Sequence, residues 1–557
     1  MGLDSAGVTV PRYFSLMTVY SVDMDFDVLL TNARVIDGTG APWFRGAVGV
    51  TDDRIDAVLR EETAAYDADI RIDVDGAVVC PGFVDTHSHS DLRLFGDPVL
   101  APKIRQGVTT EILGQDGFSM APVDREHGAD EWEDHLSGLN GRLEGEWTWS
   151  STSEYFDAIE ANGVAPNVAM LVGHGTVRYR VLGMTNREPT DAELTEMRGL
   201  VTDALEAGAI GLSTGLVYTP CTYSTTEEVA TLAGPLAEFG RPFVAHIRSE
   251  RDGIWEALDE FVDIGARMDV PLHLSHFKLG GESQHGKTAR ARALVDTARD
   301  RGVDLTADQY PYTAGSTTLS YVLPPWVHAD GPGQAVAYLD DSDARARIHD
   351  EITHDTLDDW ENPGAYSGWE NIVVTNVRTE ANEHLEGLSI AAVADEFDTD
   401  PVTAAMDLLL EEELEVSIVN HLLDEDDVRD ILRDDRVAVA TDGLFGGKPH
   451  PRVYGTYPRV LGRYVRDENV LSLETAVRKM TSVPARAMGL QSKGVLRPGM
   501  DADLVVFDPS RVDSPATYEQ PRQFPTGISQ VLINGEFAVR DGDTTGSLPG
   551  TVVRKGV

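Results

Sequence analysis

Residues 81–89 read PGFVDTHSH, an apolar strand-like run that ends in two histidines. Side chains two positions apart on a strand point to the same side, so His87 and His89 can meet one target. Seven similar runs follow, at 107–116, 167–175, 208–216, 242–250, 270–278, 303–312 and 436–443. Segments with helical periodicity separate most of them, for example 191–208 and 287–302. Eight strands that alternate with helices predict an α/β fold, a (β/α)8 TIM-like barrel.

Short strand-like runs also occupy both ends of the chain. We expect residues 27–80 and 495–557 to form one small β-sandwich domain, with the barrel at 81–494. Between the seventh and eighth runs lies an interval rich in Asp and Glu that is too long for a loop, which predicts an inserted lid at about 318–415. Residues 1–26 are expected to be a loose tail.

The composition is strongly acidic, with 46 Lys and Arg against 93 Asp and Glu and a net charge of −47. Acid spread along the whole chain is typical of a salt-adapted cytoplasm, and it argues against nucleic acid and anionic membranes as partners. Only two cysteines are present, which indicates a reducing compartment without disulfides. No apolar run reaches the roughly 18 residues of a membrane span. The sequence leaves an oligomeric state open.

Polar residues of one chemical kind gather at the ends of the predicted strands. Since the active site of such a barrel is built from the carboxyl ends of its strands, we expect these side chains to converge. Imidazole and carboxylate are the usual non-thiolate ligands of Zn²⁺, so the pattern predicts a site for zinc or a similar divalent ion. The residues in question are His87, His89, Asp116, His174, His246, His276 and Asp442. Taken alone, a histidine such as His174 is more often structural than a ligand, and Asp442 could equally be a turn residue.

The run PGFVDTHSHSD, with single histidines at strands five and six and an aspartate at strand eight, resembles the amidohydrolase superfamily of metal-dependent hydrolases. Further blocks resemble its N-acyl-D-amino-acid deacylases, or D-aminoacylases: GFSMAP, LVGHGTVR, GAIGLSTGLVYTP, HIRSE, SHFK, DQYPYTAGST and TDGLFGGKPHPRVYGTYPRVLGRYV. The resemblance runs from about Asp27 to Arg554 and is weakest in the predicted lid. It implies a hydrolase of linear amides that releases a carboxylate and a free D-amino acid.

The resemblance also implies a ligand set for one or two metal ions. His87 and His89 would hold one metal, His246 and His276 the other, and Asp442 would bind the metal-activated water as general base and acid. The family usually has a cysteine ligand where this chain has Asp116. No lysine occurs between Lys103 and Lys278, which excludes the lysine-carbamate bridge of hydantoinase-like relatives and leaves Asp116 as the candidate, a carboxylate with two oxygens.

For the carboxylate of the substrate, the resemblance points to Lys278, Tyr310, Ser316 and Arg452. Arg178 and Arg248 are alternatives for the same role. Three functions stay open on the sequence: deacylation of N-acyl-D-amino acids, hydrolysis of another amide (N-acyl-D-Glu or D-Asp, a dipeptide or a cyclic amide), and a non-catalytic scaffold. The scaffold predicts lost ligands, and no ligand position is empty here.

Overall fold

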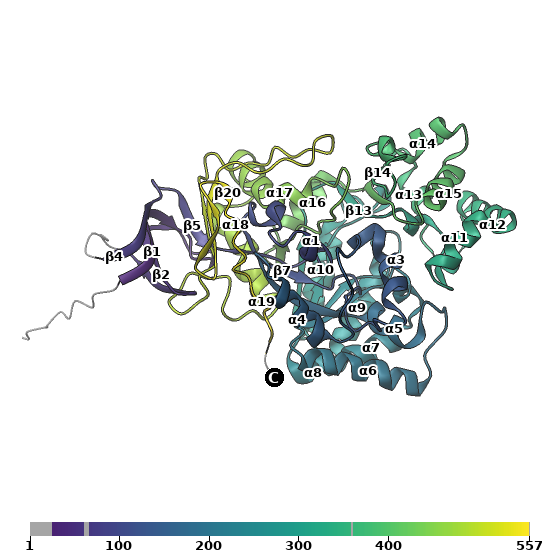
Figure 1. The fold of residues 1–557 in the computed structure, drawn as a ribbon, viewed down its shortest axis with the longest axis horizontal. Coiled ribbons are helices and arrows are strands. Elements are labelled where there is room, and N and C mark those ends of the chain that lie inside the picture. Colours follow the sequence, from purple (N-terminus) through teal and green to yellow (C-terminus); the bar gives the residue numbers. More distant parts are fainter. Residues whose placement is uncertain (1–24, 61–65, 358–359, 556–557) are drawn as a thin grey trace, which may run out of the picture.

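The structure is a computed structural model that describes residues 25–60, 66–357 and 360–555. Three β-sheets organise the chain, one built from its two ends, one forming a central barrel and one in an insertion (Figure 1). The predicted tail at 1–26 lies outside the described residues except for Asp25 and Phe26, which already belong to strand β1.

The barrel has eight parallel strands in the order β16-β12-β11-β10-β9-β8-β7-β6. They are β6 (Phe83–Asp85), β7 (Val108–Leu113), β8 (Asn167–Gly173), β9 (Gly211–Gly215), β10 (Phe243–His246), β11 (Leu272–Leu274), β12 (Leu305–Gln309) and β16 (Val437–Val439). Each falls within one of the eight predicted runs. The first and last strands meet beyond their ends, where Ser88 bridges Gly443 and the amide of Asp442 donates to the carbonyl of His87 at 2.9 Å.

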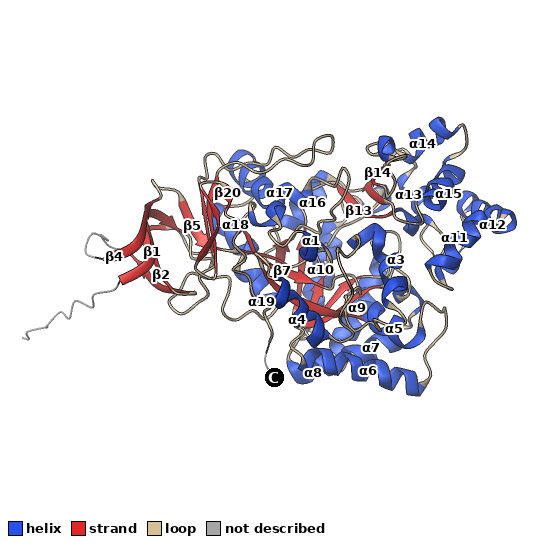
Figure 2. Cartoon of the chain, in the orientation of Figure 1, coloured by secondary structure: helices blue, strands red, loops and turns tan. Residues whose placement is uncertain are grey.

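Strands of this barrel are buried on both faces, as β8 shows: every residue of NVAMLVG is buried, and all but Asn167 are apolar or glycine. Helices cover the outer face of the barrel (Figure 2). In α9, for example, Phe261 packs on Phe243 of β10 with ring centroids 5.7 Å apart. The barrel helices are α1 (Arg93–Gly96), α2 (Ala101–Ile104), α3 (Ala129–Asn140), α4 (Thr152–Asn162), α5 (His174–Leu182), α6 (Asp191–Glu206), α7 (Thr226–Ala233), α8 (Pro235–Phe239), α9 (Ile254–Met268), α10 (Thr288–Asp300), α16 (Glu425–Leu432), α17 (Arg452–Arg459), the π-helical segment Val460–Asp467, α18 (Leu473–Met480) and α19 (Ser482–Ala487).

Strands from both chain ends pair into one nine-stranded sheet. The two ends join where β17 runs antiparallel to β5, and hydrophobic side chains of both halves share one core. The strands are β1 (Asp25–Val35), β2 (Phe44–Thr51), β3 (Arg54–Leu59), β4 (Asp67–Asp73), β5 (Val78–Pro81), β17 (Leu504–Phe507), β18 (Ile528–Ile533), β19 (Glu536–Arg540) and β20 (Asp543–Thr544).

The predicted insertion between strands seven and eight is a compact unit with its own hydrophobic core. It carries a small antiparallel sheet in which β15 pairs with both β13 and β14. Its elements are β13 (Ala314–Thr318), α11 (Pro332–Asp340), α12 (Ser342–His354), α13 (Pro363–Ser367), β14 (Ile372–Asn376), α14 (Ile390–Phe397), α15 (Pro401–Glu411) and β15 (Ser417–His421). The predicted fold class, a (β/α)8 barrel with a terminal β domain and an insertion, is confirmed. The terminal domain was predicted as a small β-sandwich, and its strands pair into the one nine-stranded sheet. Within the described ranges no helix is long and apolar enough to cross a membrane.

Candidate metal centre

Asp116 lies between two pairs of histidines. Its Oδ2 is 3.4 Å from Nε2 of His87 and 3.6 Å from Nε2 of His89. Its Oδ1 is 3.5 Å from Nε2 of His276 and 3.8 Å from Nδ1 of His246. One carboxylate oxygen therefore faces each pair, and each pair forms with Asp116 a buried three-residue group whose ligand atoms lie within 4.8 Å of one another.

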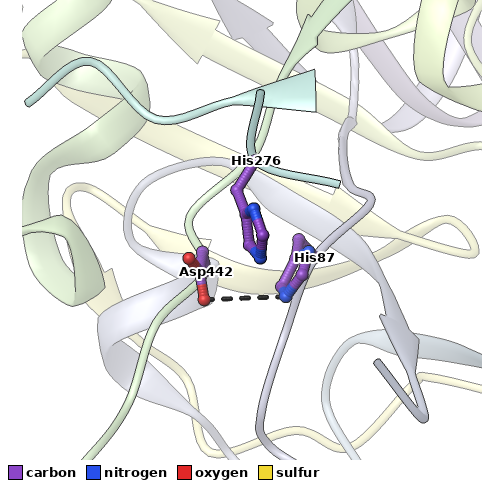
Figure 3. A group of neighbouring side chains, drawn as sticks. All are labelled: His87, His276 and Asp442. Carbon is purple, nitrogen blue, oxygen red and sulfur yellow. Dashed lines mark ion pairs between the residues drawn. The ribbon is translucent and has the colours of Figure 1, made fainter. Parts of the chain in front are cut away.

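Asp442 completes the cluster from the end of β16. Its Oδ1 is 3.3 Å from Nε2 of His89 and 3.6 Å from Nε2 of His87, and with His87 and His276 it forms a third candidate metal-binding group (Figure 3). The other oxygen, Oδ2, pairs with the guanidinium of Arg452 at 2.9 Å. Burial alone would raise the pKa of Asp442, but Arg452 and His87 more than offset this and hold that pKa far below its usual range. Asp442 is thus held as a carboxylate.

The donor atoms of the cluster fit a divalent ion. Buried side-chain atoms in proteins are normally hydrogen-bonded, yet among the described residues no hydrogen-bond partner exists for Nε2 of His87 and His89, Nδ1 of His246 or Oδ1 of Asp116. Four unsatisfied nitrogen and oxygen atoms that converge on one space are what zinc ligands require.

The backbone at the strand ends is shaped around this space. Asp116, His276 and Asp442 have positive φ angles of 55°, 33° and 48°, in the left-handed region that Asp tolerates and that histidine seldom adopts. Gly114 and Gly117 flank Asp116, also at positive φ. A Cβ atom on Gly114 would lie 2.1 Å from the carbonyl oxygen of Leu171, so only glycine allows this close approach.

The four predicted substrate residues fall into two groups. Lys278, Tyr310 and Ser316 line the pocket over the cluster; Lys278 pairs with Glu250 at 2.6 Å, and the buried Tyr310 hydroxyl has no hydrogen-bond partner among the described residues. Arg452 is fully buried, is absent from that lining and contacts Asp442 instead.

Other candidates lie away from the cluster. His174 is hydrogen-bonded to Thr214 at 2.8 Å and to Glu228 at 3.2 Å. These contacts support the interpretation of His174 as a structural histidine. Arg178 pairs with the same Glu228 at 2.6 Å. Arg248 pairs with Glu260 at 3.0 Å.

The sequence did not point to Glu250, which lies beside the candidate ligands His246 and His276. Its Oε1 is 3.0 Å from Nδ1 of His276 and 2.6 Å from Nζ of Lys278, and its Oε2 is 3.8 Å from Nε2 of His246. Carboxylates commonly orient metal-binding histidines in this way. The available signal was its position four residues after His246 in the block HIRSE.

Asp308 was also missed. Its Oδ1 accepts the backbone N–H of His276 at 2.6 Å, while Oδ2 contacts Thr86 at 2.6 Å and His273 at 2.8 Å. It therefore connects β12 to the carboxyl ends of β6 and β11, which carry candidate ligands.

A fully buried ion cluster connects β6, β7 and the segment that follows β16. The ammonium of Lys103 contacts Asp85 at 2.8 Å, Glu111 at 2.7 Å and Thr441 at 2.8 Å. Asp85 in turn accepts the backbone N–H of Thr441 at 2.8 Å. These contacts join the strand that carries the two histidines to the segment that carries Asp442.

Four imidazoles and two carboxylates converge on one space at the strand ends of a parallel barrel. This arrangement defines a metal-dependent hydrolase of the amidohydrolase type. The chain belongs to the amidohydrolase family, whose model matches residues 71–539. It is a hydrolase of carbon–nitrogen bonds with a divalent-metal cofactor, and both predictions are confirmed.

Three similar proteins cover almost the whole chain. D-aminoacylase of Alcaligenes xylosoxydans xylosoxydans is 34% identical over 95% of this chain and 98% of its own length. N-acyl-D-glutamate deacylase of the same organism is 35% identical over 95% of this chain and 96% of its own. A crystal structure of N-acyl-D-glutamate deacylase from Bordetella bronchiseptica, complexed with zinc and a phosphonate inhibitor that mimics the tetrahedral intermediate, superposes with a TM-score of 0.80 at 34% identity, covering 96% of this chain and 100% of that one.

Proposed function

We propose that this protein hydrolyses the amide bond of N-acyl-D-amino acids at a zinc centre, releasing a carboxylate and a free D-amino acid. The observation that carries the proposal is Asp116, which presents one oxygen to the His87–His89 pair and the other to the His246–His276 pair. The similarity to D-aminoacylase and to N-acyl-D-glutamate deacylase supports the substrate class.

In this proposal His87 and His89 would hold one ion and His246 and His276 the other, and Asp116 offers one carboxylate oxygen to each pair. When bound, zinc polarises the scissile carbonyl and lowers the pKa of water. Asp442 accepts the proton of the attacking water and later gives it to the leaving amine. Because Arg452 faces one oxygen of Asp442, it leaves the other oxygen directed at the ligand cluster.

The substrate carboxylate is held by Lys278, Tyr310 and Ser316, which line the pocket over the metal ligands. The hydroxyl of Tyr310 can donate to a carboxylate oxygen, and the Lys278 ammonium, which is paired with Glu250, has further N–H groups to donate. Arg452 acts on the reaction by positioning Asp442, since it is buried beneath that carboxylate rather than exposed to the pocket.

An apolar cavity next to the metal pocket favours substrates with apolar side chains. It shares Leu139, Tyr218 and Tyr321 with the metal pocket. Among its described lining residues there is no Asp, Glu, Lys or Arg, and burial lowers the pKa of its two histidines, His135 and His328, to about 4, so both are neutral at pH 7. A glutamate or aspartate side chain would find no charge partner there.

The compartment proposed for this activity is the cytoplasm. Cys80 and Cys221 are both free and buried, as expected of a protein kept in reducing conditions. The net charge of −47 opposes binding to nucleic acid or anionic lipid, so the small-molecule substrate is the proposed partner.

Hydrolysis of N-acetyl-D-methionine, N-acetyl-D-glutamate and N-acetyl-L-methionine by the zinc-loaded protein in molar KCl tests the proposal. We expect kcat/KM for the D-methionine substrate to exceed that for D-glutamate at least about tenfold, because a charged side chain is costly to bury unpaired. The Asp442→Asn protein should be slower by about a hundredfold or more. Preference for the L substrate would contradict the stereochemistry, and preference for D-glutamate would contradict the assignment of the apolar cavity.

A further inference from the structure

A second large cleft, of about 720 Å³, lies at the end of the barrel opposite the metal centre. Two of its lining residues, Asp304 and Arg436, directly precede strands β12 and β16, whereas Asp442 follows β16. Its other walls come from α10, α18, α19 and the segment 489–500 that leads into the terminal sheet. The cleft therefore lies where the barrel meets the terminal sheet, and junctions between domains are frequent ligand sites.

The charge of this cleft is opposite to that of the molecule. Two carboxylates line it, Asp304 and Asp435, against six cations. In the whole chain the ratio is reversed, with 93 acidic and 46 basic residues. The six cations are Arg299, Arg436, Arg478, Arg486, Lys493 and Arg497.

Two of the six cations are neutralised within the fold. Lys493 is buried and pairs with Asp501 at 3.0 Å and Asp503 at 2.6 Å. Arg436 pairs with Asp434 and Asp296. These two stabilise the walls and are not free to bind a ligand.

The other four guanidinium groups are available. In the part of the chain that the structure describes, no carboxylate pairs with Arg299 or Arg497, both of which are exposed. Arg478 reaches Asp435 only at 3.8 Å and Arg486 reaches Asp304 only at 3.6 Å, in both cases with an exposed carboxylate. Exposed ion pairs of this length are weak and exchange readily.

Guanidinium groups bind phosphate and carboxylate through paired N–H donors. Four of them around one cleft match a ligand with more than one anionic group. The cleft is large enough for such a molecule, since small-molecule sites span about 300–1,000 Å³. The acidic exterior repels anions in general, so an anion that binds here must be held by this local excess of positive charge.

We propose that this cleft binds a small polyanion, with two or more phosphate or carboxylate groups, at a site separate from the metal centre. The bound anion links Arg299 of α10 to Arg497 of the 489–500 segment and so ties the barrel to the terminal sheet. The anion and the N-acyl substrate do not compete for one site, because the cleft and the metal pocket share no lining residue.

Calorimetric titration of the zinc-loaded protein tests this site, at the lowest KCl concentration at which the fold is intact. The probes are fructose 1,6-bisphosphate and tricarballylate, which carry phosphates or carboxylates and chelate zinc weakly. The test protein is R299Q/R497Q. The matched control is R198Q/R540Q, which removes the same charge from two exposed positions outside the cleft.

We expect saturable binding of one probe per chain, with affinity reduced at least about tenfold in R299Q/R497Q and unchanged in R198Q/R540Q. Whichever probe binds identifies the anionic group as phosphate or carboxylate. The proposal is overturned if neither probe saturates, if both double variants weaken binding equally, or if the probe competes with the N-acyl substrate during hydrolysis.

Discussion

Asp116 stands where the resemblance to the deacylases implies a cysteine, and the two side chains differ in how many ligand atoms they offer. A carboxylate has two oxygens, and here Oδ2 faces His87 and His89 while Oδ1 faces His246 and His276. A thiolate offers a single sulfur atom on a shorter side chain. The carboxylate should therefore hold two ions more evenly than a thiolate would.

Zinc stoichiometry in the wild type and in Asp116→Cys checks this expectation. We expect the wild type to bind two ions with similar affinity, and Asp116→Cys to bind its second ion at least about tenfold more weakly because one charge-assisted contact is lost. The measurement is zinc per chain after dialysis against buffers of fixed free zinc. Asp252→Cys, which adds a thiol at a site outside the cluster, is the control. Equal stoichiometry and affinity in all three proteins would mean that Asp116 is not a shared ligand.

The positive φ angles of Asp116, His276 and Asp442 show where the backbone departs from its preferred conformations. Each costs roughly 1 kcal/mol or more, and the surrounding contacts must compensate. For His276 the compensation is visible, because its N–H donates to the buried carboxylate of Asp308 at 2.6 Å. The candidate ligand His276 is thus held in place by a carboxylate on the neighbouring strand β12.

At the scale of strands and helices, the sequence was sufficient to predict the eight barrel strands and the convergence of the candidate ligands. Both follow from local patterns, since each strand is an apolar run and each candidate ligand stands at or just beyond the end of one. Lys103, Asp85 and Glu111 could not be assigned in this way, because their pairing depends on how α2, which carries Lys103, lies against β6 and β7. The role of Arg452 was missed for the same reason, since its contact with Asp442 depends on how α17 packs after the strand.

The contact between α5 and α7 has a predictable pH dependence. His174 begins α5 and Glu228 lies in α7, 3.2 Å apart. Burial alone would lower the pKa of His174, but Cys221 and Glu228 raise it to about 9. Burial would raise the pKa of Glu228, but His174 and Arg178 lower it to about 2.

Both shifts link protonation to stability. A raised histidine pKa stabilises the fold fully below pH 6.5, and this contribution is lost as pH rises through 9. A lowered glutamate pKa stabilises the fold above pH 4.5, and this is lost as pH falls toward 2. The pair therefore contributes most to stability between pH 4.5 and pH 6.5.

We expect His174→Gln to lower the free energy of unfolding by about 1–3 kcal/mol at pH 6 and by clearly less at pH 9.5. Urea unfolding of both zinc-loaded proteins at the two pH values measures this difference. A loss that is the same at both pH values would show that His174 contributes by packing alone.

At the scale of the whole molecule, the insertion forms one wall of the metal pocket. Ser316 and Asn420 from its sheet line that pocket, and Arg251 of the barrel pairs with Glu361 of the insertion at 3.0 Å while its guanidinium lies 3.4 Å from the ring centre of Tyr366. Tyr366, which also lines the pocket, lies in the predicted lid, where the sequence resembles the family least. This is why the side-chain preference could be argued from the structure and not from the sequence.

The net charge of −47 on one chain leads to a prediction about salt. Mutual repulsion among carboxylates disfavours the compact state, and it acts over a Debye length of about 10 Å at 0.1 M salt but only about 3 Å at 1 M. We expect the unfolding temperature of the zinc-loaded protein to rise steeply as KCl increases to about 1 M and then to level off, because little repulsion is left to screen. Thermal unfolding followed by circular dichroism across a KCl series measures this curve. A rise that continues linearly to high salt, with no steep initial part, would mean that exclusion of salt from the protein surface is responsible and that charge repulsion is not.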